Sequence, residues 1–447
     1  MKKTLVAGIT LGISLLTASA FAKDEGAEKF QKAFLSGELE WQAILERAKE
    51  EGEVNWFHWG GSEQLNGWIA AKVAPELEKL GIELKTTRIA GTREAVDLVL
   101  SEKQTGRGLG EGSVDAIWLN GDNFLTLSKQ DALFGSFAAK LPNSKYFFFD
   151  PADAASELNL SDFGTPTEAR EMPWSGEQYV CYVETNRLSR QDAPSTFEEL
   201  YVWLQKNPGR FTYVKPPHYI GNTFVQSVLY AFNPRGNGYQ EFQRSIDSFS
   251  EDEFTKIVQP GFEYLKRLEP LLLGDGEPIY PQNQAANQTL FNNGEVDMGC
   301  EFGLYLVANM RKTGAFSETT ETIIFPKSGM IKNKNFIAIP GNAPHPAAAL
   351  VLANVLSSLE LQISKLKEIG YPLGVDMGKL NFDEKTLVAN AAPDHFGVTA
   401  DELSKVAVPD TNASLVKVIQ SIWIEYIERD SETPFPEIVR MSMEKAK

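Results

Sequence analysis

The stretch VNWFHWGGS, residues 54–62, opens with β-branched and aromatic residues and predicts a strand that ends at a pair of glycines. Ser62 then stands where a helix N-cap is expected, and apolar residues recur at helical spacing as far as Leu80. A second strand is predicted over 82–89 and a second helix over 93–102. This β-α-β-α order favours a parallel sheet with helices on both faces.

The same alternation continues on either side of this stretch. Upstream, a helix is predicted from Trp41 to a left-handed C-cap at Gly52, and downstream a third strand, VDAIWLN, covers 114–120. Past a Pro- and Asp-rich interruption, a second α/β unit is predicted over roughly 176–331. The strand over 335–340 and the helix over 345–356 then resemble the first unit again.

The second unit contains its own strand and helix signals. We predict strands at QYVCYVE, FTYV and EVDMGCEF, and a capping box of Ser195 with Glu198 at the start of one helix. A further helix is predicted over 284–291, and the C-terminal part is helical, including 416–427. The predicted fold class is therefore α/β, with two mainly parallel sheets flanked by helices.

Composition narrows the possible functions. The chain has 447 residues, 43 basic against 60 acidic side chains and a formal net charge of -17. Its length predicts two or three hydrophobic cores, because single cores stop growing near about 250 to 300 residues. The negative charge excludes phosphate backbones and anionic lipid surfaces as natural partners. We expect no nucleic acid partner.

The N-terminus resembles a cleavable secretory signal. Lys2 and Lys3 precede an apolar stretch over 4–16, and the small-residue site Ala20-Phe21-Ala22 follows, so we predict cleavage after Ala22 and a periplasmic protein. A membrane anchor is the alternative, but the stretch is shorter than the ~20 apolar residues that span a bilayer. No later segment has that length, so we expect no direct membrane insertion.

The two cysteines leave two alternatives. Cys181 and Cys300 are 119 positions apart, and an oxidising compartment permits a disulfide between them. Two buried thiols that pack as small apolar side chains are the other interpretation, which we slightly favour.

Ligands of open α/β sheets bind beyond the carboxyl ends of the strands, where helices begin. That rule selects four segments, namely 60–62, 120–123, 217–223 and 301–303. In and beside them, aromatic side chains are combined with short polar ones, as a pocket for a small solute requires. For Trp59 and Trp118, a place in the core is as good an interpretation as a place in the pocket. Trp174 and Tyr219 flank Pro and Gly, which favours a place in a cleft between the two predicted units. The predicted ligand-binding residues are Trp59, Gly61, Ser62, Asn120, Asp122, Asn123, Trp174, Tyr219, Asn222, Thr223, Glu301 and Phe302.

Signals for catalysis and for cofactors are missing. The chain has no phosphate-binding loop, dinucleotide fingerprint, zinc motif or nucleophile elbow, and its four histidines lack metal-ligand spacing. We therefore predict no catalytic residue, no metal and no cofactor. The alternative function is a secreted hydrolase that uses Asp122 and Glu301 as acid and base.

Several blocks together resemble a known family. The runs NNGEVDMGCEFG (292–303) and NFIAIPGNAPHPAAALVLANVLSSLELQ (335–362), with PLG at 372–374, are similar to periplasmic solute-binding proteins of bacterial ABC importers. The blocks HWGGS, VDAIWLNGDNF, EMPW, PGRFTYVKPP and IGNTF resemble the YnjB-like group of that family. Asp122 stands where that group has Glu, and His218 and Tyr219 stand where an acid and an aromatic residue are expected.

The resemblance implies a two-lobed fold of type II. The implied lobes are 23–174 with 333–375, and 175–332 with 376–447, and a solute bound in the cleft closes them. The closed form then docks on an inner-membrane permease with its ATPase subunits, and no catalysis is expected. We expect a monomer. Aromatic and acidic residues favour a thiamine-like or other flat, cationic solute, and a neutral sugar is close behind.

Overall fold

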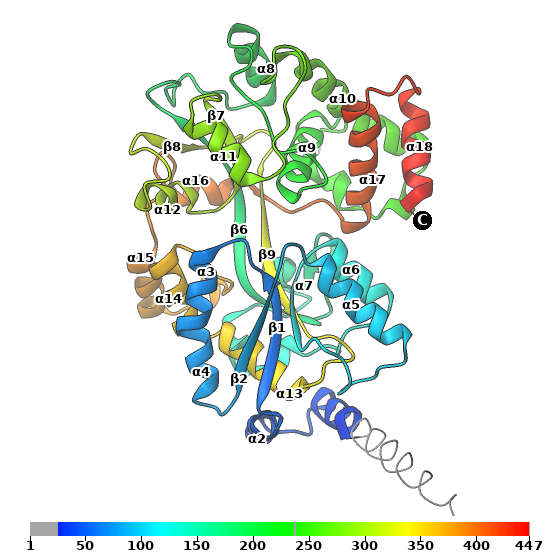
Figure 1. Cartoon of the computed structure of the whole chain (residues 1–447), viewed down its shortest axis with the longest axis vertical. Coiled ribbons are helices and arrows are strands. Elements are labelled where there is room, and N and C mark those ends of the chain that lie inside the picture. Colours follow the sequence, from blue (N-terminus) through cyan, green and yellow to red (C-terminus); the bar gives the residue numbers. More distant parts are fainter. Residues whose placement is uncertain (1–25, 237, 447) are drawn as a thin grey trace, which may run out of the picture. The chain divides into compact units, whose positions relative to one another are not determined.

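The computed structural model describes residues 26–236 and 238–446, and the predicted signal sequence lies outside them. The chain forms two compact units (Figure 1). Unit 1 contains the chain up to Leu160 together with Thr167–Trp174 and Phe336–Leu361, and unit 2 contains Ser161–Pro166, Ser175–Asn335 and the chain from Gln362 onward. Segment 362–375 thus groups with unit 2, whereas we had assigned it to the first lobe. The lobe boundaries themselves stay a prediction.

Unit 1 is built on a mainly parallel sheet, as expected. Strand β1 (Glu53–Trp59) pairs in parallel with β2 (Glu83–Ile89) on one side and with β3 (Ala116–Leu119) on the other. The last residues of β9 (Met330–Ala338) pair antiparallel with β3, and the strand order of the sheet begins β2-β1-β3-β9 and continues to β6 (Glu171–Glu184). The three parallel strands are those that the sequence predicts, because each is a short run with β-branched or aromatic residues between turn residues.

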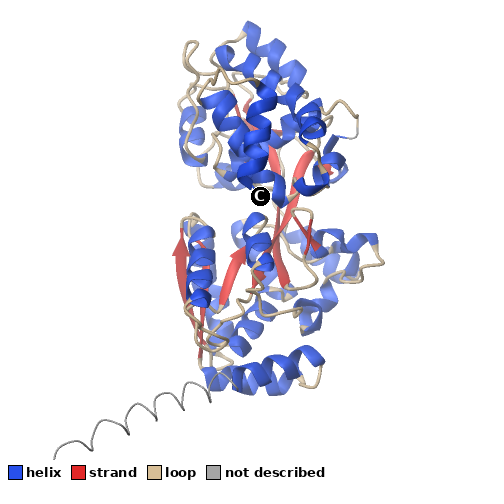
Figure 2. Ribbon diagram, turned by 90° about the vertical axis from the view of Figure 1, so that its right-hand side faces the viewer, coloured by secondary structure: helices blue, strands red, loops and turns tan. Residues whose placement is uncertain are grey.

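Helices surround this sheet (Figure 2). Residues 26–36 are helical, and Gly52 ends α2 with φ 78°, which confirms the predicted C-cap. Helix α13 (Pro346–Leu356) is apolar on all sides, and nearly every residue in it is buried. It packs against α2, α4 (Ala74–Glu78) and β1. The named helices of the unit are α2 (Trp41–Glu51), α3 (Glu63–Trp68), α4 (Ala74–Glu78), α5 (Arg93–Gln104), α6 (Asp122–Lys129), α7 (Glu157–Leu160) and α13 (Pro346–Leu356).

No single helix in the described ranges is long and apolar enough to cross a membrane. One pair passes that test on length and composition, namely α13 with α14 (Leu359–Ile369), and it is bent by 59°. Burial of α13 within unit 1 accounts for its apolar character.

The sheet of unit 2 differs from our expectation, because its strands pair antiparallel. Strand β6 (Glu171–Glu184) pairs with β7 (Met298–Phe302) and with β8 (Thr320–Ile323), both antiparallel, and short β10 (Ala407–Val408) runs parallel to the start of β9. A two-stranded ribbon, β4 (Ser161–Asp162) with β5 (Thr165–Pro166), completes the set. The mixed α/β class is confirmed, but a mainly parallel sheet in this unit was wrong.

Two local predictions in unit 2 also need correction. The segment 211–214 forms no strand, because its backbone bonds to a loop instead: Leu273 N donates to the Phe211 carbonyl oxygen at 2.9 Å. The capping residue of α8 (Phe197–Lys206) is Thr196, whose side chain accepts from Glu199 N at 3.1 Å. The predicted box is thus displaced by one residue, because Ser195 bonds to the Glu199 side chain and does not cap the helix.

The core of unit 2 lies among its long helices. Trp423 and Tyr213 are buried in it, and the indole N–H of Trp423 donates to the Tyr213 hydroxyl group at 3.0 Å. The remaining helices are α9 (Tyr219–Phe232), α10 (Glu251–Leu268), α11 (Gln284–Asn292), α12 (Leu306–Lys312), α14, α15 (Phe382–Ala391), α16 (Ala400–Lys405), α17 (Ala413–Trp423) and α18 (Phe435–Ala446).

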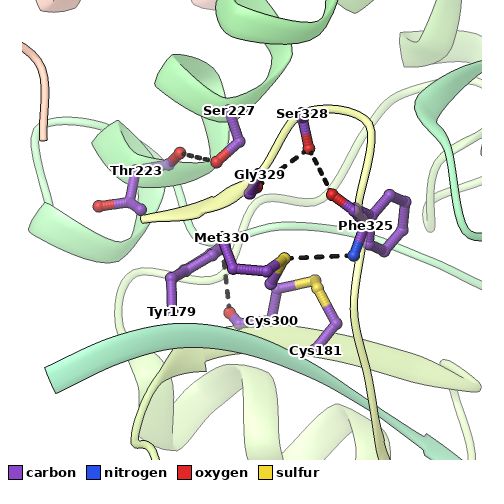
Figure 3. Close-up of a disulfide and its surroundings, with 9 residues drawn as sticks. All are labelled: Tyr179, Cys181, Thr223, Ser227, Cys300, Phe325, Ser328, Gly329 and Met330. Atoms are coloured by element: carbon purple, nitrogen blue, oxygen red, sulfur yellow. Dashed lines mark hydrogen bonds between the residues drawn. A yellow bond between two sulfur atoms is a disulfide. The ribbon is translucent and has the colours of Figure 1, made fainter. Parts of the chain in front are cut away.

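Cys181 and Cys300 form a disulfide (Figure 3). They face each other in the antiparallel register of β6 and β7, with their Cα atoms 4.0 Å apart. Our preference for two free thiols was therefore wrong, because the sequence alone does not reveal which residues of two strands are aligned. The Tyr179 hydroxyl group donates to the Cys300 carbonyl oxygen at 3.4 Å beside the bridge.

Candidate ligand-binding site

The predicted residues of unit 1 lie at the carboxyl ends of β1 and β3. Trp59 ends β1 and is half-buried, and Ser62 caps α3 by accepting a hydrogen bond from Leu65 N at 3.3 Å. Gly61 lies against the indole ring: a Cβ atom at this position would be 2.2 Å from Cζ2 of Trp59. Glycine is therefore required here to leave the ring in place.

The second loop of unit 1 turns from β3 into α6. Asn120 follows the strand, Gly121 takes φ 60°, and Asp122 opens the helix, where its carbonyl oxygen accepts from Thr126 Oγ1 at 2.6 Å. The Oδ1 atom of Asn123 is buried and has no hydrogen-bond partner among the described residues. A buried acceptor without a partner is rare in proteins, which makes this atom a candidate for the ligand-binding site.

Four tryptophans form a chain of edge-on contacts behind these loops. The ring centroids of Trp59 and Trp118 are 6.1 Å apart, those of Trp118 and Trp174 4.9 Å, and those of Trp174 and Trp56 5.5 Å. Trp174 is fully buried, although we expected it beside the ligand, whereas Trp59 is partly exposed. Trp174 therefore packs against Trp118, and Trp118 in turn contacts the partly exposed ring of Trp59.

The predicted residues of unit 2 gather where α9 begins. The cis peptide bond Pro216–Pro217 precedes His218, whose ring nitrogen accepts from Ile220 N at 3.3 Å and caps the helix. Tyr219 is 45% exposed, and its ring lies 6.1 Å from that of Phe302 at the end of β7. Helix α9 (Tyr219–Phe232) packs against β7, which brings these two aromatic rings together.

The two polar residues of α9 have different roles. Thr223 donates to the carbonyl oxygen of Tyr219 at 2.9 Å, so its hydroxyl group serves the helix. Asn222 donates to the Pro217 carbonyl oxygen at 3.2 Å, and its Oδ1 atom is shielded and without a partner in the described ranges. Of the two side chains, Asn222 is the one with an acceptor left unused by the described residues.

Glu301 lies one residue before Phe302 and only 3% of it is exposed. Both its carboxylate oxygens accept hydrogen bonds from the Gln288 amide nitrogen, at 2.9 and 3.0 Å. Burial raises the pKa of Glu301 to about 7, and hydrogen bonds from Gln288 and Tyr182 oppose that shift. A buried carboxylate with a strongly shifted pKa is a candidate for a functional site, where a polar or charged partner interacts with it.

Sequence reasoning missed the residues that hold this group. Gln284 and Gln288 lie one turn apart on α11, and the first accepts a hydrogen bond from the Tyr219 hydroxyl group at 3.5 Å. Their i, i+4 spacing in QNQAANQ was a visible signal for one polar helix face. Nothing local, however, connected that face to β7.

A second carboxylate, Glu177 on β6, was also missed. Its side chain accepts from Leu304 N at 2.9 Å, and burial raises its pKa to about 7. Buried Lys365 lies near enough to oppose that rise. Burial lowers the pKa of Lys365 well below its usual range, and Glu177 opposes that shift in turn. Each therefore stabilises the charged form of the other.

Two histidines make contacts within the fold. His345 interacts with Asp115 at 3.0 Å, and His395 Nδ1 lies 3.0 Å from the Leu304 carbonyl oxygen. Within the described residues, no group of three or more His, Cys, Asp or Glu side chains is arranged to hold a metal ion. Asp122 belongs to unit 1 and Glu301 to unit 2, so neither unit alone contains the pair that a hydrolase would need.

Comparison with known proteins identifies the class. The family model of bacterial extracellular solute-binding proteins matches residues 71–374, which is well over half of the chain. The chain belongs to this family, and the resemblance found in its sequence is confirmed. It is a solute-binding protein of the ABC transporter type.

One relative is Protein YnjB of Escherichia coli (strain K12). It is 30% identical over 360 residues, which cover 79% of this chain and 87% of that protein. Among solved structures, a chitin oligosaccharide binding protein has a TM-score of 0.62 at 15% identity, covering 88% of this chain and 98% of its own. A putative spermidine/putrescine ABC transporter from Listeria monocytogenes has a TM-score of 0.52 at 14% identity, with the same coverage. These structures show the fold alone.

Proposed function

We propose that this chain captures a small organic solute outside the cytoplasmic membrane, holds it without chemical change and delivers it to an ABC permease. The observation that supports this best is the aromatic pair of Tyr219 and Phe302 beside the buried Glu301 carboxylate. Rings supply stacking surface and a few fixed polar groups orient the solute, which is how small-molecule sites are built.

The two groups of residues supply different contacts. In unit 1, Trp59 offers a partly exposed ring and Asn123 a buried acceptor. In unit 2, Tyr219 and Phe302 offer rings and Asn222 an acceptor. The proposed ligand contacts are thus the predicted ones without Trp174 and Thr223, which support their neighbours.

The solute has two leading classes. A thiamine-like or other flat, cationic compound suits rings beside a carboxylate, and a neutral sugar suits rings with amide groups. The names of similar structures mention both kinds, since one is a chitin oligosaccharide binding protein and another a putative spermidine/putrescine transporter.

Export is the first part of the proposal to test. The family is extracellular, and we propose that the chain reaches the periplasm through cleavage after Ala22. N-terminal sequencing of protein from a periplasmic extract should begin at Lys23. Retention of residues 1–22 on membrane-bound protein would contradict cleavage.

The solute itself is best found by native mass spectrometry of residues 23–447, purified gently and then stripped by unfolding and refolding. A discrete mass lost on stripping identifies the solute, and restoring it at about 100 times Kd should stabilise the protein by about 2.7 kcal/mol. The bound mass should be the same after hours of incubation. If no mass appears and vitamins, polyamines and sugars leave the melting temperature unchanged, the proposal fails.

A further inference from the structure

Among the described residues, the Glu301 carboxylate lacks the cationic partner that two other buried acids, Asp297 and Glu102, have. Asp297 is paired with Arg187 and Arg210, and Glu102 with Arg107 at 2.8 Å. In the described part of the chain, Glu301 forms no ion pair with Lys, Arg or His, and both its oxygens share one neutral amide group of Gln288. A buried carboxylate with such partners has its charge uncompensated, which is costly.

Aromatic side chains surround Glu301. Burial raises the pKa values of Tyr179 and Tyr182 further above their usual range, and Glu301 contributes to each shift. Tyr219 is 45% exposed, and it lies close enough to both Glu301 and Glu177 to interact with them electrostatically. A cation at this position would have ring faces and a carboxylate together.

The helix α11 connects the exposed ring to the buried charge. Gln284 accepts from Tyr219 and Gln288 donates to Glu301, and the two glutamines lie one turn apart on one face. The hydroxyl group of Tyr219 and the carboxylate of Glu301 are therefore on the same side of α11. A solute stacked on Tyr219 has its polar end next to that helix face.

We infer that the solute is an organic cation whose positive charge pairs with Glu301 beside the rings of Tyr219 and Phe302. This inference rests on the proposed function and chooses between its two solute classes. A neutral sugar could donate hydroxyl hydrogens to Glu301 but would leave the desolvated charge uncompensated, whereas a cation neutralises it.

The pairing makes binding depend on pH in a defined direction. The cation binds the ionised carboxylate, so binding below the pKa of Glu301, which is about 7, must first release its proton. The affinity of a probe with a permanent charge should be constant above about pH 8 and fall by about tenfold per unit below pH 7. Glu177 and Asp410 also have pKa values of about 7, so the pH effect is assigned by substitution.

The test is isothermal titration of the full mature chain with cationic probes (thiamine, choline and spermidine) and neutral probes (thiochrome and chitotriose). Glu301→Gln removes the charge and keeps the shape, Glu301→Asp keeps the charge, and Glu295→Gln removes an exposed carboxylate nearby as the matched control. We expect a cationic probe to bind about 100-fold more weakly to Glu301→Gln and unchanged to Glu295→Gln. Glu301→Asp should be intermediate, and Glu301→Gln should lose the pH dependence.

The outcomes separate this inference from the proposed function. A neutral probe that binds tightly, with an affinity that Glu301→Gln leaves within about threefold, overturns the inference and leaves the proposed function standing. A cationic probe that binds equally to wild type and Glu301→Gln also overturns it. Failure of all cationic probes up to about 1 mM does the same, and failure of the neutral probes as well counts against the proposed function.

Discussion

At the scale of single residues, the aromatic rings of unit 2 are the most direct test of solute binding. Tyr219 and Phe302 should each contribute stacking of about 1 kcal/mol, so Tyr219→Ala and Phe302→Ala should each weaken binding of the co-purified solute by roughly fivefold. Val202 on α8 is also exposed, and Val202→Ala serves as the control with no expected effect. Equal affinities for all three variants in calorimetry would remove these rings from the site.

Gly61 is predicted to be irreplaceable for steric reasons. Gly61→Ala forces a Cβ atom into the indole of Trp59, so we expect a loss of about 1 to 3 kcal/mol in the free energy of unfolding and altered tryptophan fluorescence. Gly67 in α3 has open space around its Cα, and Gly67→Ala should be neutral or stabilise by about 0.5 to 1 kcal/mol. Urea unfolding of both variants measures the difference, and similar values for both would refute the steric argument.

Glu301 should also make stability depend on pH. Its folded pKa of about 7 lies above the unfolded value of 4.5, so the folded state holds the proton more tightly and loses stability as pH rises between these values. We therefore compare the unfolding free energies of Glu301→Gln and wild type. Their difference should shift by about 2 to 3 kcal/mol in favour of Glu301→Gln as the pH rises from 5 to 8. Denaturant unfolding at both pH values checks this, and a constant difference would contradict it.

At the scale of elements, the disulfide ties β7 to β6 next to Glu301. The two cysteines are 119 positions apart, and a bridge that closes so long a loop constrains the unfolded chain strongly. The double variant Cys181→Ser with Cys300→Ser should lose about 2 to 4 kcal/mol of unfolding free energy in guanidinium. Wild type treated with a reductant is the companion measurement, and an unchanged midpoint in both would show that the bridge adds no stability.

Element predictions succeeded where the signal was local. The strand over 54–59 and the cap at Gly52 depend on neighbours in sequence and were confirmed. Segment 211–214 has an equally good strand composition, but its backbone bonds to a loop about 60 residues away, which no local pattern contains. Strand direction in unit 2 has the same origin, because β7 reaches β6 only after more than a hundred residues of helices and loops.

At the scale of the whole molecule, the chain should bind its solute in a 1:1 ratio and return it unchanged. Mass spectrometry of the solute after long incubation with equimolar protein should find no product. Asp122→Asn should affect only the affinity for the solute. Neither wild type nor this variant should convert the solute into a product. A product that disappears with Asp122→Asn or Glu301→Gln would instead support the hydrolase alternative.

The sequence by itself determined the family, the α/β class and most element positions, because these depend on residue types at short spacing. Only the tertiary structure decided that Cys181 bonds to Cys300, that Trp174 is buried and that Gln288 holds Glu301. Each of these depends on which distant strands and helices lie side by side. Burial and pairing are properties of that packing, and they convert an ordinary glutamate into a desolvated charge that a solute can neutralise.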